Sequence, residues 1–152
     1  MQLTPHFALA EFTRSAKAAQ LRLDNTPTGK ALENLKRTAE ILERVRAHLG
    51  VPIIITSGYR GPVLNKAVGG ATSSDHLQGL AADVLAPKFG PPYEVAKALV
   101  PHIDALGVGQ IIYEVSGSTH WVHLSARVPE KRSNRVITIV VGKGAQLGIQ
   151  RV

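Results

Sequence analysis

The chain has 152 residues, of which 44% are hydrophobic and 19% are charged. This length fits one domain with a single core, and the composition lies within the globular range. The absence of cysteine excludes disulfides and thiol chemistry. No apolar run approaches the roughly eighteen residues of a membrane span, which excludes a spanning helix.

The basic balance of the chain favours polyanionic surroundings, because the net charge is +7 and the pI is near 10.1. Nucleic acid, teichoic acid, lipopolysaccharide and the acidic bacterial envelope are all such partners. The basic residues are scattered, and aromatic residues make up only 5% of the chain, which argues against a stacking platform for single strands. If the charge serves a partner, we expect the anionic bacterial envelope rather than nucleic acid. A solvated basic surface is the simplest explanation of the charge alone.

The N-terminal part, residues 1–50, is predicted to be helical. Residues 1–24 are predicted to form short helices. Asn25 and Pro27 then mark the start of a longer helix, since a capping residue precedes proline in the first turn. Apolar residues recur at three- and four-residue spacing, which predicts an amphipathic helix over about 28–48 that Gly50 ends. This apolar stripe consists of Leu32, Leu35, Ala39, Leu42, Val45 and Leu49.

The central region, residues 51–127, contains short β-branched or apolar runs bounded by turn residues, which is typical of strands. A helix is expected over 93–100 and a hairpin loop over 115–119. The expected strands of this region cover residues 52–56, 83–86, 110–113 and 121–125.

The C-terminal part, residues 128–152, is predicted to add one strand over 136–141 and a loose tail from Gly142. Helices followed by strands, with a few helices between them, indicate an α+β fold around an antiparallel sheet. We therefore expect a single domain over 1–152, in which helices pack on an antiparallel sheet of about four strands.

Three separated residues, His76, Asp83 and His123, form a set that can hold a zinc ion. Two imidazoles and one carboxylate give three protein ligands and leave a fourth position for water, as a catalytic zinc site requires. A structural zinc site is normally closed by four ligands, mostly thiolates, and this chain has no cysteine. The sequence thus predicts one zinc ion per chain, at a site that is open to water.

These ligands lie in a longer frame of motifs. The frame consists of Ser-Gly-Tyr-Arg at 57–60, Leu-Asn at 64–65, Val-Gly-Gly at 68–70, Ser-Asp-His-Leu-Gln-Gly-Leu-Ala-Ala-Asp at 74–83 and His-Trp-Val-His at 120–123. Gly79, Ala81 and Ala82 are small enough for the chain to fold back between the first two ligands, so that both side chains converge.

The whole frame resembles the LAS-type zinc peptidases. These include D-alanyl-D-alanine carboxypeptidases, dipeptidases, L-alanyl-D-glutamate endopeptidases of phage lysins and the related hedgehog signalling domain. In that family the motif S-x-H-x-x-G-x-A-x-D is followed later by a third ligand in a short H-x-H or E-x-x-H context. The resemblance covers about residues 53–125, and the stretch over 4–15 looks closest to small phage and prophage members. It implies the same α+β fold.

The resemblance also implies roles for other residues. Arg60 matches an arginine that binds a carboxylate or a carbonyl oxygen of the substrate, a task that suits a planar guanidinium. Ser74 matches a serine that contacts substrate, and Tyr59 and Gln110 are expected in the frame or in the pocket. Asp75 could support the neighbouring ligand, but a solvated loop position is the simpler expectation.

A general base must take the proton of the attacking water, and the sequence leaves two candidates. Carboxypeptidase members commonly place a glutamate three residues before the third ligand, where this chain has His120. Glu114 follows the strand over 110–113 and would face the hairpin that carries His123. Hedgehog-like members have a similar Tyr-Glu pair, which makes Glu114 the first candidate. Histidine is the side chain that ordinarily changes charge near neutral pH, so His120 could serve instead, or stabilise an oxyanion.

The ligand set and the resemblance together favour a zinc peptidase, with residues 51–127 as its catalytic core. The resemblance implies that it cleaves a D-Ala-D-Ala or an L-Ala-D-Glu bond in peptidoglycan stem peptides. The alternative is an inactive zinc-holding domain that binds cell wall or a protein partner. The chain begins without the basic and apolar segments of a signal peptide. We therefore expect synthesis in the bacterial cytoplasm and delivery to the wall by a holin or a virion, as for a bacteriophage endolysin.

Overall fold

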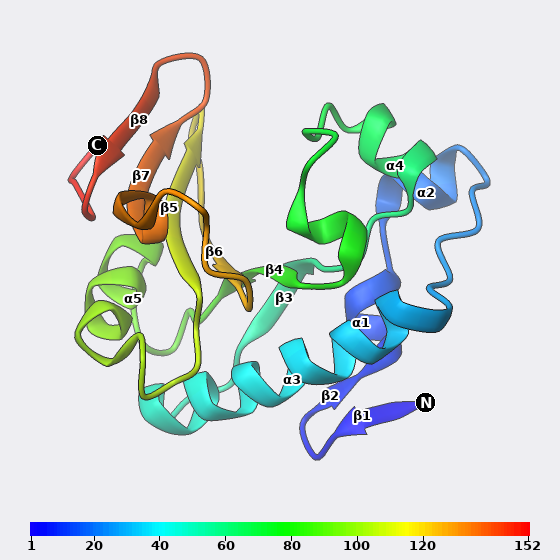
Figure 1. The fold of residues 1–152 in the computed structure, drawn as a ribbon, viewed down its shortest axis with the longest axis horizontal. Coiled ribbons are helices and arrows are strands. Elements are labelled where there is room, and N and C mark those ends of the chain that lie inside the picture. The colour runs from blue at the N-terminus through cyan, green and yellow to red at the C-terminus, as the bar shows by residue number, and fades with distance from the viewer.

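Six strands form one mixed sheet at the centre of the fold, in the order β3-β4-β6-β5-β7-β8 (Figure 1). The computed structural model describes all 152 residues. Neighbouring strands are antiparallel except β5 and β7, which run parallel. The strands are β3 (Ile54–Ser57), β4 (Ala81–Leu85), β5 (Gln110–Ser116), β6 (Thr119–Ser125), β7 (Val136–Val140) and β8 (Gly144–Leu147).

The α+β class is confirmed, but an antiparallel sheet of about four strands is wrong in strand number and in direction. β5 and β6 form a hairpin, and the chain then returns through residues 126–135 to start β7 beside the beginning of β5. This return makes β7 parallel to β5. The strand predicted over 136–141 is present, but no local pattern in it specifies the partner or the direction.

The tail from Gly142 is not loose, because β8 pairs antiparallel with β7 from Ile137 opposite Leu147 to Val140 opposite Gly144. All residues of β8 are exposed. The strand therefore lacks the alternation of buried and exposed positions by which a sequence reveals a half-buried strand.

The long predicted helix is confirmed as α3 (Gly29–Leu49), and the helix expected over 93–100 as α5 (Pro92–Leu99). Gly50 ends α3 in the left-handed conformation, with φ of 72°. The hairpin loop predicted over 115–119 narrows to two residues, because β5 and β6 extend further than their apolar runs. None of the helices combines the length and the apolar character required to cross a bilayer.

The N-terminal segment contains a small separate sheet as well as short helices. β1 (Gln2–Thr4) and β2 (Phe7–Ala8) pair with each other, and α1 (Leu9–Thr13) and α2 (Ala16–Gln20) follow them. The rings of Phe7 and Phe12 are fully buried and meet edge to face, with centroids 6.3 Å apart. These two rings belong to the main hydrophobic core, so they anchor the segment to the rest of the fold.

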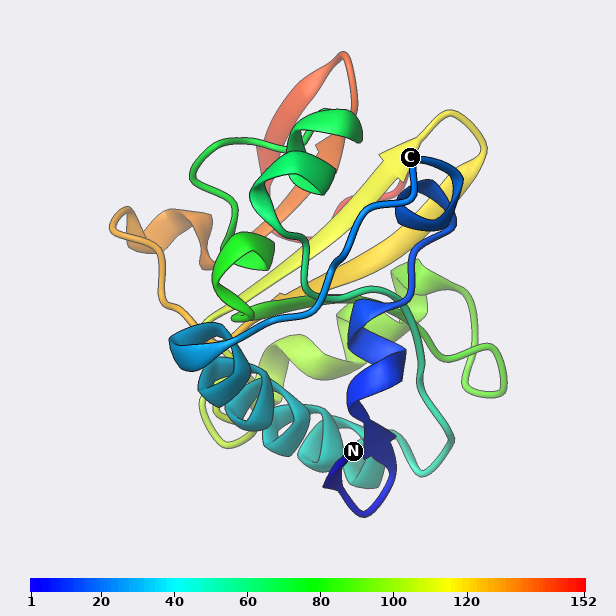
Figure 2. The ribbon, with the colours of Figure 1, turned by 90° about the vertical axis from the view of Figure 1, so that its right-hand side faces the viewer.

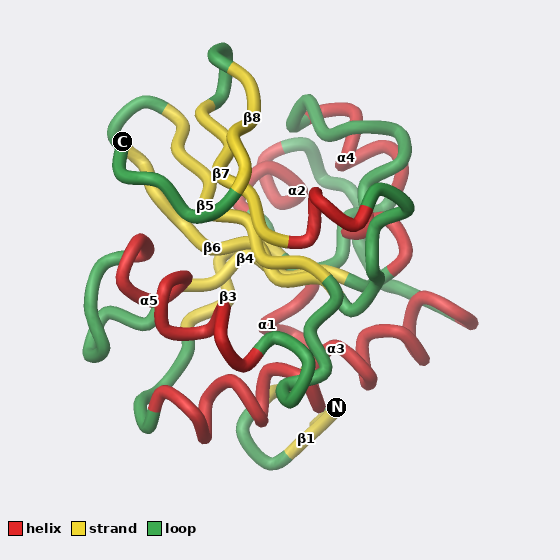
Figure 3. Tube along the Cα trace, turned by 60° about the vertical axis from the view of Figure 1, so that its left-hand side comes forward, coloured by secondary structure: helices red, strands yellow, loops and turns green.

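The two faces of the sheet differ because successive residues of a strand point to opposite sides. Ile111 and Tyr113 of β5, with Val122 and Leu124 of β6, point into a hydrophobic core of 26 buried residues. Figures 2 and 3 show α3 and α5 on this side of the strands, whereas α4 (Pro62–Ala67) lies on the other side. The charged residues of the site project from that second side.

A sharp turn at Gly79 connects the 3₁₀ helix η1 (Asp75–Gln78) to β4, and α3 holds this turn in place. The Thr38 hydroxyl donates a hydrogen bond to the carbonyl oxygen of Gly79 at 2.7 Å. Gly79 has φ of +74°, and a β-carbon there would lie 2.5 Å from the carbonyl oxygen of Ala31. Only glycine therefore fits, both for its conformation and for its close approach to α3.

We expect Gly79→Ala to destabilise the fold more than Gly50→Ala, which is a matched control. Both residues have a left-handed backbone, for which alanine costs about 1–2 kcal/mol. A β-carbon at Gly50 meets nothing within 4 Å, so only Gly79→Ala adds a clash with α3, worth roughly 1–3 kcal/mol. Urea unfolding followed by the fluorescence of the single tryptophan measures both losses, and equal losses would contradict the packing argument.

Candidate functional site

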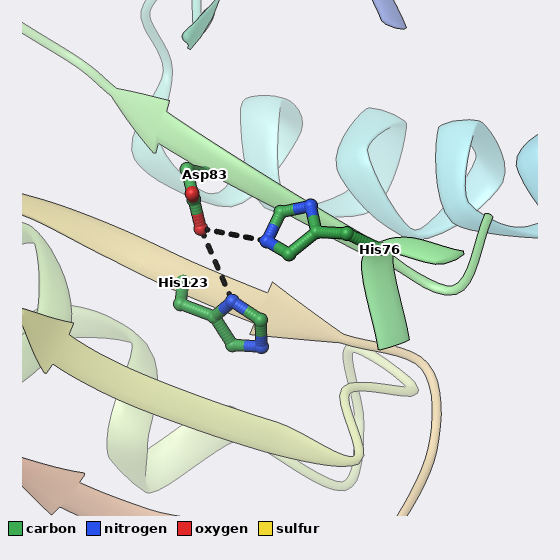
Figure 4. Close-up of side chains that lie close together, drawn as sticks. All are labelled: His76, Asp83 and His123. Carbon is green, nitrogen blue, oxygen red and sulfur yellow. Dashed lines mark hydrogen bonds and ion pairs between the residues drawn. The ribbon is translucent and has the colours of Figure 1, made fainter. Parts of the chain in front are cut away.

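The three predicted ligands converge on one face of the sheet (Figure 4). His76 comes from η1, Asp83 from β4 and His123 from β6, and all three residues are buried. Asp83 and His123 are direct partners in the register of β4 and β6, so their side chains leave the sheet side by side. One ligand atom from each residue lies within 4.8 Å of the others, so the group could hold a metal ion.

A hydrogen bond to the backbone sets the tautomer of His76. Its Nδ1 lies 2.7 Å from the carbonyl oxygen of Gly58, and a carbonyl only accepts, so Nδ1 carries the proton. Nε2 therefore presents a lone pair to Oδ1 of Asp83, 3.3 Å away. Two acceptors that face each other require a cation between them, which is either a proton on Nε2 or a metal ion.

The spacing of the ligand atoms suits a small tetrahedral cation. Oδ1 of Asp83 lies 3.3 Å from Nε2 of His76 and 3.1 Å from Nδ1 of His123. At its usual bond lengths, tetrahedral zinc separates neighbouring ligand atoms by about 3.3 Å. The donor set and these two distances therefore fit zinc.

The charges of the group are strongly coupled. Burial alone raises the pKa of the Asp83 carboxyl, but the charges and hydrogen bonds of His76 and His123 outweigh burial and hold this pKa well below its usual range. Burial alone lowers the pKa of His123, whereas the hydrogen bond and the charge of Asp83 raise it above its usual value. The group is thus organised around one buried carboxylate that attracts positive charge.

The group opens into a cleft of about 510 Å³, as a catalytic site requires. Four of the residues predicted for catalysis or substrate binding line this cleft, and two do not. Those in the wall are Arg60, Ser74, Gln110 and Glu114, and those outside it are Tyr59 and His120.

Glu114 stands directly beside the proposed ligands. It lies opposite Trp121 in the register of β5 and β6, on the same face as His123, and its Oε1 is 3.9 Å from Nδ1 of His123. Burial raises the pKa of the Glu114 carboxyl, and the negative charge of Asp83 adds to this rise, against the opposing charges of His123 and Arg60. A raised pKa makes the carboxylate a better proton acceptor.

His120 lies on the opposite face of the sheet. It precedes His123 by three residues on the same strand, and alternation along a strand sends these two side chains to opposite sides. Nδ1 of His120 lies 2.6 Å from the hydroxyl of Tyr113, which points toward the core side. The geometry therefore favours Glu114 over His120 as the group that can reach a water near the ligands.

Arg60 is held over the cleft from two directions. Its backbone N–H donates to the carbonyl oxygen of His76 at 3.1 Å, and its Nη2 donates to the Ser74 hydroxyl at 3.3 Å. Nε is buried without a hydrogen-bond partner in the chain. Burial lowers the pKa of Arg60, although Asp83 and Glu114 oppose this shift. A buried guanidinium with an unused donor is suited to an oxyanion of a ligand.

Tyr59 and Gln110 have structural contacts of their own. The ring of Tyr59 packs against the hydrophobic core and lines a separate hollow of about 260 Å³, which Arg60 and Asp83 also border. Gln110 lines the main cleft, but its side-chain amide donates to the carbonyl oxygen of Asn134 at 2.8 Å. Only Gln110 therefore lies where a substrate in the main cleft could reach it.

The expectation that Asp75 is a solvated loop residue is wrong, because the structure buries it. Its Oδ2 accepts from the Ser125 hydroxyl and its Oδ1 accepts from Nε of Arg127, both at 2.7 Å. Ser125 lies two residues after His123, on the same face of β6. Alternation along the strand could therefore have predicted that Ser125 lies on the side of the sheet where the site is. Arg127 is 52 residues from Asp75, and no local pattern connects them.

Comparisons with known proteins show the family of this chain. No curated protein matches the chain. A family model described as Peptidase M15 matches residues 5–125, which is well over half of the chain and a range that contains the three proposed ligands. The chain therefore belongs to the Peptidase M15 family of LAS-type zinc peptidases.

Proposed function

We propose that this protein is a zinc peptidase that hydrolyses a peptide bond in the stem peptides of bacterial peptidoglycan. The observation that carries the proposal is the buried group of His76, Asp83 and His123 at an open cleft, with Glu114 beside it. Membership of the Peptidase M15 family supports it. The proposed bond is D-Ala-D-Ala or L-Ala-D-Glu.

The proposed ligands are Nε2 of His76, Oδ1 of Asp83 and Nδ1 of His123, with one zinc ion per chain. The chemistry that zinc supplies at such a site is to acidify water and to polarise the scissile carbonyl. Glu114 takes the proton of the attacking water, because its carboxylate lies closest to the ligands and burial increases its basicity. Arg60 orients the substrate through a carboxylate or carbonyl oxygen, from its position beside Ser74.

The proposal extends to biological context on the resemblance of the motif frame to small phage and prophage members. A lysin of that origin, delivered to the wall by a holin or a virion, would meet its substrate at the anionic envelope, which suits a chain of net charge +7.

The zinc assignment predicts that His123→Ala lowers the zinc content of the purified protein from about one ion per chain to a small fraction of that. Loss of one of three ligands leaves too few donors for tight binding. His102→Ala is the matched control, since His102 is an exposed histidine outside the cleft, and it should leave the content unchanged. Elemental analysis measures all three proteins, and equal zinc in His123→Ala and the parent would contradict the assignment.

The size of the core predicts that the fold survives removal of the metal. A core of 26 buried residues lies on the far side of the sheet from the ligands, so folding does not depend on zinc as it does in a zinc finger. After treatment with a chelator, circular dichroism should retain the helical signal, and thermal unfolding should stay cooperative at a lower midpoint. Complete unfolding on chelation would show that the zinc is structural.

The mechanism predicts that Glu114→Gln lowers hydrolysis of purified peptidoglycan by about a hundred- to ten-thousand-fold while zinc content stays the same. His120→Ala is the comparison, and we expect a far smaller loss, because this side chain faces Tyr113. Release of new amino and carboxyl termini measures the activity. Near-normal activity of Glu114→Gln with an inactive His120→Ala would reverse the two roles. A parent protein with zinc that releases no termini from the wall or from short stem peptides would favour the inactive binding domain instead.

A further inference from the structure

Arg127 lies in the wall of the cleft, and the proposed reaction does not use it. It follows β6 and is fixed at two points. Its backbone N–H donates to the Ser125 hydroxyl at 3.1 Å, and its Nε donates to Oδ1 of Asp75 at 2.7 Å. Asp75 is itself buried beside His76 in the chain, so Arg127 has a fixed position relative to the proposed ligands.

The outer edge of this guanidinium is free. The ion pair with Asp75 uses Nε only, and neither Nη atom has a hydrogen-bond partner in the chain. The side chain is 46% exposed. A guanidinium held through Nε presents Nη1 and Nη2 as a parallel pair of donors, which matches the two oxygens of a carboxylate. An arginine that served only to neutralise Asp75 would not need this exposed edge in the cleft.

The charge of the cleft also suits an anionic ligand. Its wall contains the two guanidinium groups of Arg60 and Arg127 and the three carboxylates of Asp75, Asp83 and Glu114. With neutral histidines the wall alone carries one negative charge, and a divalent ion at the proposed ligands changes this to one positive charge. Arg60 and Arg127 are held by different partners, Ser74 and Asp75, so they offer two separate anchoring points.

We propose that Arg127 binds a carboxylate of the peptide substrate, at a second anionic subsite distinct from Arg60. This inference rests on the proposed function, because it takes a stem peptide as the ligand. Two carboxylates of a stem pentapeptide have the required chemistry, namely the free α-carboxylate of D-glutamate and the C-terminal carboxylate. Arg127 then selects substrates by charge, whereas Glu114 and the zinc ligands carry out the reaction.

The test measures binding of three peptides to the zinc-loaded Glu114→Gln protein by titration calorimetry, so that no turnover interferes. The peptides are a stem pentapeptide, the same peptide with a D-glutamate α-carboxamide, and the same peptide with a C-terminal carboxamide. We expect at least one of the two amides to bind about tenfold or more weakly than the parent peptide, since it loses a charged bidentate contact. Adding Arg127→Gln should reduce the ratio of parent to amide affinity to within about threefold for one amide, and that amide identifies the carboxylate that Arg127 binds.

Arg132→Gln is the matched control, because it removes the same charge from an exposed residue outside the cleft and should leave the ratio intact. Arg127→Lys retains a charge that can pair with Asp75 but lacks the parallel pair of Nη donors, so it should keep only part of the discrimination. This variant replaces Arg127→Gln if Arg127→Gln does not fold. Equal weakening of all three peptides by Arg127→Gln would make Arg127 a structural support for Asp75 and overturn the subsite. Absence of discrimination, or of any binding, in the Glu114→Gln protein would overturn it too.

Failure of the proposed function has a different signature. It appears as absence of hydrolysis by the parent protein with zinc, whereas the subsite is judged from binding ratios of a protein that does not turn over. If the Glu114→Gln protein binds all three peptides equally well while the parent protein hydrolyses the wall normally, the subsite alone is overturned.

Discussion

The approach of Gly79 to helix α3 is the constraint on which the site depends. His76 and Asp83 lie on either side of this turn, and their side chains converge only because the backbone at Gly79 is left-handed and packs against Ala31. Thr38 of the same helix fixes the turn through a buried hydrogen bond. The amphipathic helix therefore has two roles, since it closes the core and also sets the angle between two of the proposed ligands.

The sheet separates stability from chemistry. Alternation along β5 and β6 sends Tyr113 and Val122 into the core and Glu114 and His123 into the cleft, so the same strands build both. A buried carboxylate such as Asp83 costs free energy unless positive groups compensate it, and here two histidines do so. The unfavourable charges are thus confined to one face, while the apolar face supplies the burial that holds the domain together.

The walls of the cleft are tied to the ligands by short polar contacts. Ser74 accepts hydrogen bonds from both the backbone of His76 and the guanidinium of Arg60, and Asp75 joins the start of η1 to the end of β6. Arg60 and Arg127 are therefore held by the two residues that immediately precede His76. A short segment, from Ser74 to His76, thereby sets the positions of one proposed ligand and of both arginines of the cleft.

The sequence by itself determined the features that depend on local pattern. The period of apolar residues located α3, and Gly50 marked its end. The frame around His76, Asp83 and His123 predicted a group that the fold brings together and that could hold a metal ion. Only the tertiary structure decided the parallel pairing of β7, the exposed strand β8, the face of His120 and the pair of Asp75 with Arg127. The physical reason is that strand partners and contacts between distant residues depend on how the chain returns to the sheet, and the composition of a segment does not encode its partner.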